Sequence, residues 1–188
     1  FLGKTSVVAK DTPAFIGNRI GIFGIQSLFH QVKEMGLTVE EVDKLTGPVI
    51  GRPKSATFRT VDMVGLDTLV HVANGIYENC PNDEAHELFK LPEFVNKMME
   101  NKWLGSKTGQ GFYKKEGKEI LTLDLDTLEY RASKKASFAT LELTKTIDKP
   151  IDRFKVLVKG KDKAGEFYRK NFASMFQYCS NRIPEITD

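Results

Sequence analysis

DTPAFIGNRIGIFGIQ, at residues 11–26, begins a segment whose apolar side chains would surround almost the whole circumference of a helix. Thr12 can cap such a helix through its side-chain oxygen. Pro13 suits the first helical turn, because the N–H that proline lacks would have no partner there anyway. Gly36 supplies the left-handed residue that commonly ends a helix. The pattern therefore predicts one long helix from about Pro13 to Met35.

Four small residues of this helix lie on one stripe, because they are spaced three, four and three positions apart: Ala14, Gly17, Gly21 and Gly24. A glycine inside a helix costs roughly 0.5–1 kcal/mol relative to alanine, so three of them imply a compensating close approach. The stripe predicts either tight packing against another helix or room for a ligand or a neighbouring domain.

Two polar side chains interrupt the apolar segment near its start. A buried amide such as that of Asn18 must find partners or cost on the order of 1–3 kcal/mol. It can donate to a carbonyl and accept from an imidazole at the same time. From the pattern alone, we interpret Asn18 as a satisfied structural amide and Arg19 as a cation at the surface or at a domain interface.

The composition is that of a globular protein with one domain, or one domain and a piece of another. The chain has 188 residues, of which 40% are hydrophobic and 28% charged, and its net charge of +3 does not favour nucleic-acid binding. Basic clusters at Lys114–Lys118, Lys134–Lys135 and Lys159–Lys163 are short and mixed with acidic residues. We interpret them as solvated surface or as a docking site for an anionic group such as a phosphate.

The cysteines and the hydropathy pattern exclude further classes. Cys80 and Cys179 are far apart and in no metal-ligand spacing, so neither a disulfide framework nor a metal site is predicted. This usage fits a reducing compartment and a cytoplasmic location. Because no apolar run reaches 18 residues, no membrane span is predicted.

The rest of the chain is predicted to be mainly helical. Ser6–Lys10 is β-branched and predicts a short strand, and Thr38 with Glu41 forms a capping box at the start of a short helix. Further segments with a helical pattern follow at Ser55–Met63, Asp67–Glu78, Leu91–Asn101, Lys134–Thr146, Ile151–Val158 and Lys163–Arg182. A hairpin is predicted from Ile120–Leu123 and Leu128–Arg131.

Three features that could mark a catalytic or nucleotide site do not fit the corresponding motifs. GSKTGQG at Gly105–Gly111 does not have the spacing of a phosphate-binding loop, because Gln110 stands where that loop needs a Gly-Lys pair. We interpret it instead as a turn that lays Phe112 and Tyr113 onto the helices. His30 and His71 have no acidic residue at a catalytic spacing and are predicted to be partly buried. No Gly-x-Gly-x-x-Gly turn is present, so a dinucleotide site is not predicted.

Three segments occur in a specific order: Gly3–Arg19, Val61–Thr68 and Trp103–Tyr113. In this order they resemble the C-terminal region of the 3-hydroxyacyl-CoA dehydrogenase family. The segment from Ala164 to Ile186 resembles the opening of a second helical copy that larger members carry, and its Asn181-Arg182 pair echoes Asn18-Arg19.

The resemblance implies a helical bundle of the 6-phosphogluconate-dehydrogenase C-terminal type. It implies that residues 1–12 are the remnant of a nucleotide-binding domain with a Rossmann exit strand, and that residues 13–115 form the first helical domain. Residues 116–160 would hold the hairpin and connecting helices, and residues 161–188 the start of a truncated second copy. The nucleotide-binding domain, with its His–Glu acid–base pair, would lie upstream of this fragment.

The resemblance also implies a function. Such enzymes oxidise (3S)-3-hydroxyacyl-CoA to 3-oxoacyl-CoA with NAD in fatty-acid β-oxidation, and Asn18 would be the catalytic residue present here. Its amide would hydrogen-bond the substrate oxygen or orient the histidine. The intact parent would bind NAD, take an acyl-CoA substrate and form a homodimer, whereas this fragment would bind no cofactor and be inactive alone. The alternative is a standalone helical module for dimerisation or acyl-CoA binding.

Overall fold

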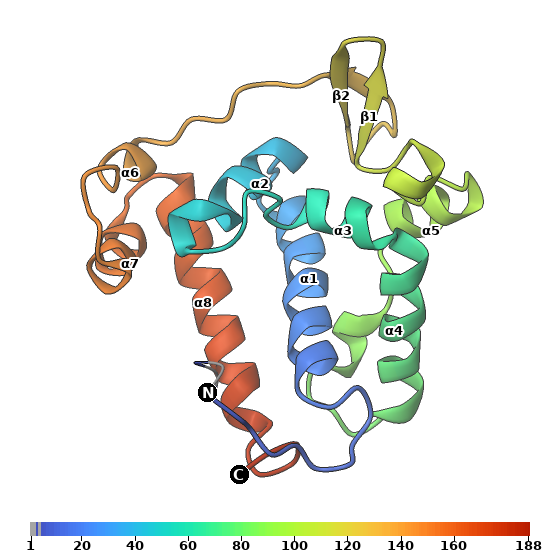
Figure 1. Cartoon of the computed structure of the whole chain (residues 1–188), viewed down its shortest axis with the longest axis vertical. Helices are drawn as coiled ribbons and strands as arrows, with labels where there is room; N and C mark the ends of the chain where they lie inside the picture. Colours follow the sequence, from blue (N-terminus) through green and yellow to red (C-terminus); the bar gives the residue numbers. More distant parts are fainter. Residues whose placement is uncertain (1–2, 4) are drawn as a thin grey trace.

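The computed structural model describes residue 3 and residues 5–188, and these residues form a mainly α fold, as predicted. The central helix α1 (Gly17–Glu34) lies between α8 (Lys163–Asn181) and α4 (Leu66–Asn79) (Figure 1). The remaining helices are α2 (Val39–Thr46), α3 (Phe58–Val64), α5 (Glu93–Glu100), α6 (Ala139–Glu142) and α7 (Pro150–Lys159), with the 3-10 helices η1 (Pro48–Ile50), η2 (His86–Phe89) and η3 (Ser106–Thr108).

An aromatic cluster around Phe29 of α1 forms the centre of the core. The Phe29 ring is fully buried, and its centroid lies 5.6 Å from that of Phe58, 5.4 Å from that of Phe94 and 5.7 Å from that of Phe112. These partners come from α3, α5 and the segment after η3. Because aromatic pairs contribute about 0.5–1.5 kcal/mol each beyond their burial, the cluster joins the elements of residues 15–115 into one core.

Helix α8 packs along α1 and runs antiparallel to it (Figure 1). The rings of Phe23 in α1 and Tyr178 in α8 are stacked, with centroids 3.7 Å apart. At the other end of α8, the Tyr168 hydroxyl donates to the Leu45 carbonyl at 2.8 Å. The last long helix is therefore part of the same packed structure as the first helices.

The sheet has three antiparallel strands in the order β1 (Tyr113–Glu116), β2 (Glu119–Leu123) and β3 (Tyr130–Ala132). The predicted hairpin is confirmed as the β2–β3 pair, in which Leu123 lies opposite Tyr130. Strand β1 was not predicted, because its Lys-Lys-Glu sequence carries no alternating apolar pattern.

The predicted helix ends are confirmed at several points. Gly36 has a left-handed φ of +55° and follows Met35, the C-cap residue of α1. The Thr38 capping box forms as predicted: Glu41 N–H donates to the Thr38 hydroxyl at 3.3 Å, and Thr38 N–H donates to the Glu41 carboxylate at 2.9 Å. None of the helices in the described part of the chain is both long and apolar enough to cross a membrane.

The predicted start of the first helix is wrong. Helix α1 begins at Gly17 rather than Pro13, because Ala14 and Phe15 adopt left-handed φ values of 65° and 48°. The Thr12 side chain makes no cap: its hydroxyl has no partner among the described residues. The chain therefore enters α1 through a strained turn instead of a capped helical turn.

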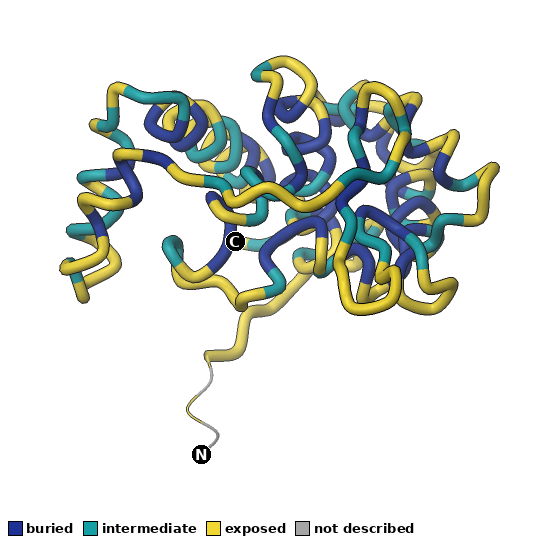
Figure 2. The backbone as a smooth tube through the Cα atoms, turned by 90° about the horizontal axis from the view of Figure 1, so that it is seen from above, coloured by how far each residue is buried: buried dark blue, intermediate teal, exposed yellow. Residues whose placement is uncertain are grey.

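The predicted exit strand is also wrong for this chain. Residues 5–10 are extended but are not assigned to a strand, and they run along the outside as exposed chain (Figure 2). A strand needs a neighbouring strand to pair with, and the three described strands lie at the opposite end of the bundle (Figure 1).

The predicted helix over Lys134–Thr146 is mostly absent. Only α6 forms, and residues 133–138 cross the molecule as an extended segment that we call the strap (Figure 1). The Glu40 carboxylate accepts from Lys134 N–H at 2.9 Å, and the Ser133 hydroxyl donates to the Ile120 carbonyl at 2.8 Å. These contacts stabilise the extended conformation of the strap over the predicted helix.

Candidate functional site

Asn18 lies in the first turn of α1 and its side chain is exposed. Its amide makes no hydrogen bond to any other described residue, so the interpretation as a satisfied structural amide is wrong. An amide has two donors and two acceptor positions. All of them are therefore open to a group that approaches this end of the helix.

Arg19, the next residue, is buried and only 1% exposed, so the prediction of a surface or interface cation is wrong. Its Nη2 lies 2.6 Å from Oδ2 of Asp83, and its Nε donates to the Tyr178 hydroxyl at 2.8 Å. Burial alone would lower the pKa of Arg19, but the hydrogen bonds to Asp83 and Tyr178 raise it. The charge is kept and anchors the first turn of α1.

Asp83 is the centre of this buried ionic cluster. Its carboxylate also accepts from the Tyr178 hydroxyl at 2.8 Å and from Arg182 at 3.2 Å. Burial disfavours its charge, but the Ala85 N–H, Tyr178 and Arg19 lower the pKa of Asp83. Asp83 is not predicted from the sequence, because no local pattern marks it as the partner of residues from two distant helices.

The C-terminal segment fastens the chain that leads into α1. Lys10 N–H donates to the Ile186 carbonyl at 3.0 Å, and Lys10 Nζ donates to the Pro184 carbonyl at 2.6 Å. The Thr187 hydroxyl donates to the Val8 carbonyl at 2.9 Å. Two sets of contacts therefore fix the position of Asn18: the ionic cluster around Arg19, and the hydrogen bonds between the C-terminal segment and the chain that leads into α1.

The glycine stripe divides into an open and a packed part. A Cβ added at Gly17 or Gly21 would meet nothing within 4 Å, whereas one at Gly24 would lie 2.7 Å from Cε of Met175 in α8. The predicted tight packing therefore holds at Gly24 only. Gly17 and Gly21 leave open the surface beside Asn18.

An apolar groove continues this open surface along α1. It has a volume of about 640 Å³ and lies between α1, α7 and α8, with Gly21 and Ile25 on one side and Phe154, Phe172 and Phe176 on the other. Phe176 is 68% exposed. The start of α1 therefore combines an unpaired amide, an uncovered backbone and an apolar groove.

The glycine-rich turn lies on Asp62, as expected for a packing turn. The Asp62 carboxylate accepts from Phe112 N–H at 2.9 Å and from Tyr113 N–H at 2.8 Å, and Phe112 is fully buried. A Cβ at Gly105 or Gly111 would collide with Asp62. Burial raises the pKa of Asp62 to about 6, although the two backbone N–H groups act to lower it.

The histidines do not contribute to this site. His30 and His71 are exposed, so the prediction that they are partly buried is wrong. His86 is half-buried, and its ring stacks on Tyr77 with centroids 4.0 Å apart. The described residues therefore offer Asn18, and no histidine beside it, for chemistry at the start of α1.

Known proteins of one family are similar to this chain. The family model for the C-terminal domain of 3-hydroxyacyl-CoA dehydrogenase matches residues 15–115, just over half of the chain. A probable 3-hydroxyacyl-CoA dehydrogenase of Bacillus subtilis (strain 168) is 46% identical over 187 residues, which is 100% of this chain and 24% of the relative.

Two further relatives differ in how much of the chain they match. A putative fatty acid oxidation complex trifunctional enzyme of Rickettsia prowazekii is 24% identical over 192 residues, covering 100% of this chain and 25% of the relative. The mitochondrial hydroxyacyl-coenzyme A dehydrogenase of Rattus norvegicus is 34% identical over 113 residues, covering 60% of this chain and 35% of that enzyme. The chain spans about a quarter of the length of the B. subtilis and R. prowazekii relatives. This chain belongs to the 3-hydroxyacyl-CoA dehydrogenase family, and its residues 15–115 match the C-terminal domain of that family.

Proposed function

We propose that this chain is the helical C-terminal part of an NAD-dependent dehydrogenase that oxidises (3S)-3-hydroxyacyl-CoA to 3-oxoacyl-CoA in fatty-acid β-oxidation. In this proposal the missing nucleotide-binding domain packs against the start of α1, and the substrate lies between the two domains. The observation that carries the proposal is the exposed amide of Asn18, which has no hydrogen-bond partner among the described residues and lies on a firmly anchored helical turn.

Asn18 acts by position in this proposal. Its amide hydrogen-bonds the substrate oxygen or orients the histidine base of the upstream domain. A rigid first turn matters for this role, because holding reacting groups in a fixed geometry removes several kcal/mol of entropic barrier. Arg19 and Asp83 supply that rigidity without contacting the substrate.

The residues of this chain do not suit NAD. The sequence has no Gly-x-Gly-x-x-Gly turn, and the sheet of the described residues is antiparallel, unlike the parallel sheet of dinucleotide-binding domains. We therefore assign the NAD of the parent enzyme, which serves as its oxidant, to the missing domain.

The domain boundaries, the dimer and the location remain parts of the proposal. Residues 13–115 would be the first helical domain, and residues 161–188 the start of a second copy. The α7–α8 side of the apolar groove, with Phe154, Phe172 and Phe176, would supply the homodimer contact, since exposed apolar surface of this kind commonly marks an interface. The cytoplasmic location expected from the sequence stays a prediction.

The proposal is tested by comparing two proteins. The complete parent enzyme should reduce acetoacetyl-CoA with NADH, as followed by the loss of NADH absorbance. The 188-residue chain should show no turnover in that assay. Robust turnover by the 188-residue chain, or a complete parent without activity on acyl-CoA, would contradict the proposal.

A further inference from the structure

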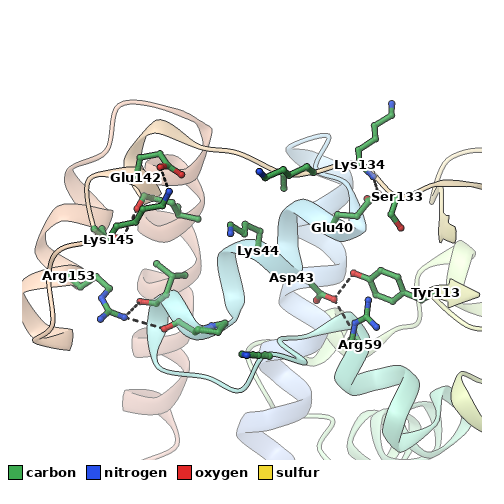
Figure 3. A pocket seen from close by; sticks show the side chains of 17 residues that line it. Glu40, Asp43, Lys44, Arg59, Tyr113, Ser133, Lys134, Glu142, Lys145 and Arg153 are labelled. Atoms are coloured by element: carbon green, nitrogen blue, oxygen red, sulfur yellow. Dashed lines mark hydrogen bonds and ion pairs between the residues drawn. The ribbon is translucent and has the colours of Figure 1, made fainter. Parts of the chain in front are cut away.

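A second cavity lies at the opposite end of α1 from Asn18. It has a volume of about 610 Å³ and is bounded by α2, η1 with the segment after it, the strap and α6–α7 (Figure 3). Asn18 and Glu34 are separated by 16 residues, or ~24 Å along the helix axis. The cavity, which we call the basic cleft, is therefore distinct from the proposed catalytic cleft.

The lining of the basic cleft carries a strong excess of positive charge. Seven of its side chains are cationic and three are acidic, which leaves a net charge of +4 on the lining. The cations without a carboxylate partner among the described residues are Lys44, Lys54, Arg59, Lys134, Lys135 and Arg153. The seventh, Lys145, pairs with Glu142.

The acidic side chains of the cleft are already engaged. Arg131, outside the lining, donates to the two Glu40 oxygens at 2.7 and 3.1 Å. Burial opposes the charge of Glu40, but Arg131 and Lys134 N–H lower its pKa to about 2. Asp43 accepts from the Tyr113 hydroxyl at 2.7 Å and from Phe58 N–H at 2.7 Å. Neither carboxylate is free to neutralise the lysines of the cleft.

Two sides of the cleft are held in place. Arg153 donates to the carbonyls of Pro48 at 3.2 Å, Val49 at 3.1 Å and Ile147 at 2.9 Å, so its charge is fixed at the wall (Figure 3). The strap is anchored at its start through Lys134 N–H. At the far end of the strap, Phe138 is buried in the core. The positive charges therefore line a cavity whose walls are held in place by these contacts, rather than a flat surface.

We propose that the basic cleft binds a nucleotide-sized ligand that carries adjacent phosphate groups. The volume is in the range of small-molecule sites. Phosphates match the lysine charges that have no carboxylate partner among the described residues. The apolar side chains of Val49, Ala136 and Leu141 line a part of the cleft that an uncharged moiety can cover. Free nucleotides and the phosphorylated end of CoA share this chemistry.

The test is calorimetric titration of the 188-residue chain with ADP, CoA and inorganic pyrophosphate at low ionic strength. The cleft variant combines Lys134→Glu with Lys135→Glu. The control combines Lys115→Glu with Lys118→Glu on the β1–β2 hairpin, where both lysines are exposed and outside the cleft. The two variants change the net charge equally.

The proposal expects ADP or CoA to bind more tightly than pyrophosphate, with at least tenfold weaker binding in the cleft variant and less than a twofold change in the control. Tighter binding of CoA would assign the cleft to a CoA-bearing ligand, and tighter binding of ADP to a free nucleotide. Absence of binding by all three probes, pyrophosphate binding as tightly as ADP and CoA, or equal weakening in both variants would overturn the proposal. Because the assay needs neither NAD nor turnover, its failure is separate from failure of the dehydrogenase proposal.

Discussion

Arg19 and Arg182 bind the same carboxylate oxygen, with Nη2 of Arg19 at 2.6 Å and Nη1 of Arg182 at 3.2 Å from Oδ2 of Asp83. The two arginines stand at the first turn of α1 and directly after the last turn of α8. Successive residues of a helix point about 100° apart, so a buried Arg19 turns Asn18 toward the surface. The ionic cluster thereby determines where the free amide points.

We predict that Asp83→Asn strongly destabilises the fold. The substitution removes the buried charge that Arg19 and Arg182 share, leaving them only the partly exposed Glu84 and Glu185, and breaking such a cluster costs about 3–5 kcal/mol. The measurement is the free energy of unfolding from urea denaturation. The control is Asp126→Asn, whose partner Lys33 is exposed and whose loss should cost less than about 1 kcal/mol. Equal losses for the two variants would contradict the assigned role of Asp83.

We predict that Asp62 makes the fold more stable as the pH falls from about 6 to about 4. Burial raises its pKa to about 6 in the folded chain, above the ordinary value of 3.8. The folded chain therefore binds the proton more tightly than the unfolded chain, and this contribution is lost as the pH rises through 6. The measurement is the carbon-13 chemical shift of the Asp62 carboxyl group, whose midpoint should lie near 6. A midpoint below 4 would show that the two backbone N–H donors outweigh burial.

We predict that Glu40→Gln releases the strap. The charge of Glu40 holds Arg131 and Lys134 N–H, and its pKa is lowered to about 2. Its contribution to stability is therefore present above the ordinary pKa of 4.5 and is lost as the pH falls toward 2. Hydrogen exchange at pH 7 should show faster exchange of Lys134 N–H in the variant. Unchanged protection of this group would mean that Glu40 does not anchor the strap.

We predict opposite effects of Gly21→Ala in the two forms of the protein. In the 188-residue chain the added methyl group meets nothing, so the helix should gain roughly 0.5–1 kcal/mol. In the complete parent the same methyl group would obstruct a domain that packs against α1, and turnover should fall. Gly36→Ala is a contrasting variant, because Gly36 has a left-handed φ and alanine there should destabilise both forms. Full activity of Gly21→Ala in the parent would argue against a domain at this surface.

The sequence predicts elements whose signals are local. The Thr38 capping box and Gly36 lie within a few residues of the groups they satisfy, so the ends of their helices were predicted correctly. The contact with Asp62 shows the limit of such predictions. The sequence predicts that the glycine-rich turn packs on the helices, but it does not identify Asp62, 50 residues from Phe112, as the partner.

The errors have a common physical cause. Arg19 is buried because it hydrogen-bonds Asp83 and Tyr178. These partners are 64 and 159 residues away in the sequence, so a local helical pattern cannot reveal them. Residues 6–10 have the composition of a strand, but a strand forms only beside another strand. The strap has the composition of a helix, but its contact with Glu40 favours an extended conformation. For the same reason, the pattern alone favoured a buried Asn18, whereas the tertiary structure leaves it exposed.

The most direct measurement is the turnover number of the complete parent enzyme with Asn18→Ala, alongside the melting temperature of the same variant. Asn181→Ala is the matched control, because its exposed side chain follows the same dipeptide pattern but hydrogen-bonds Glu84 at 2.9 Å. If the amide of Asn18 acts on the reacting centre, its removal should lower turnover on the order of 100-fold with the melting temperature almost unchanged, and the control should keep full activity. Normal turnover with a large loss of thermal stability in Asn18→Ala would contradict the account.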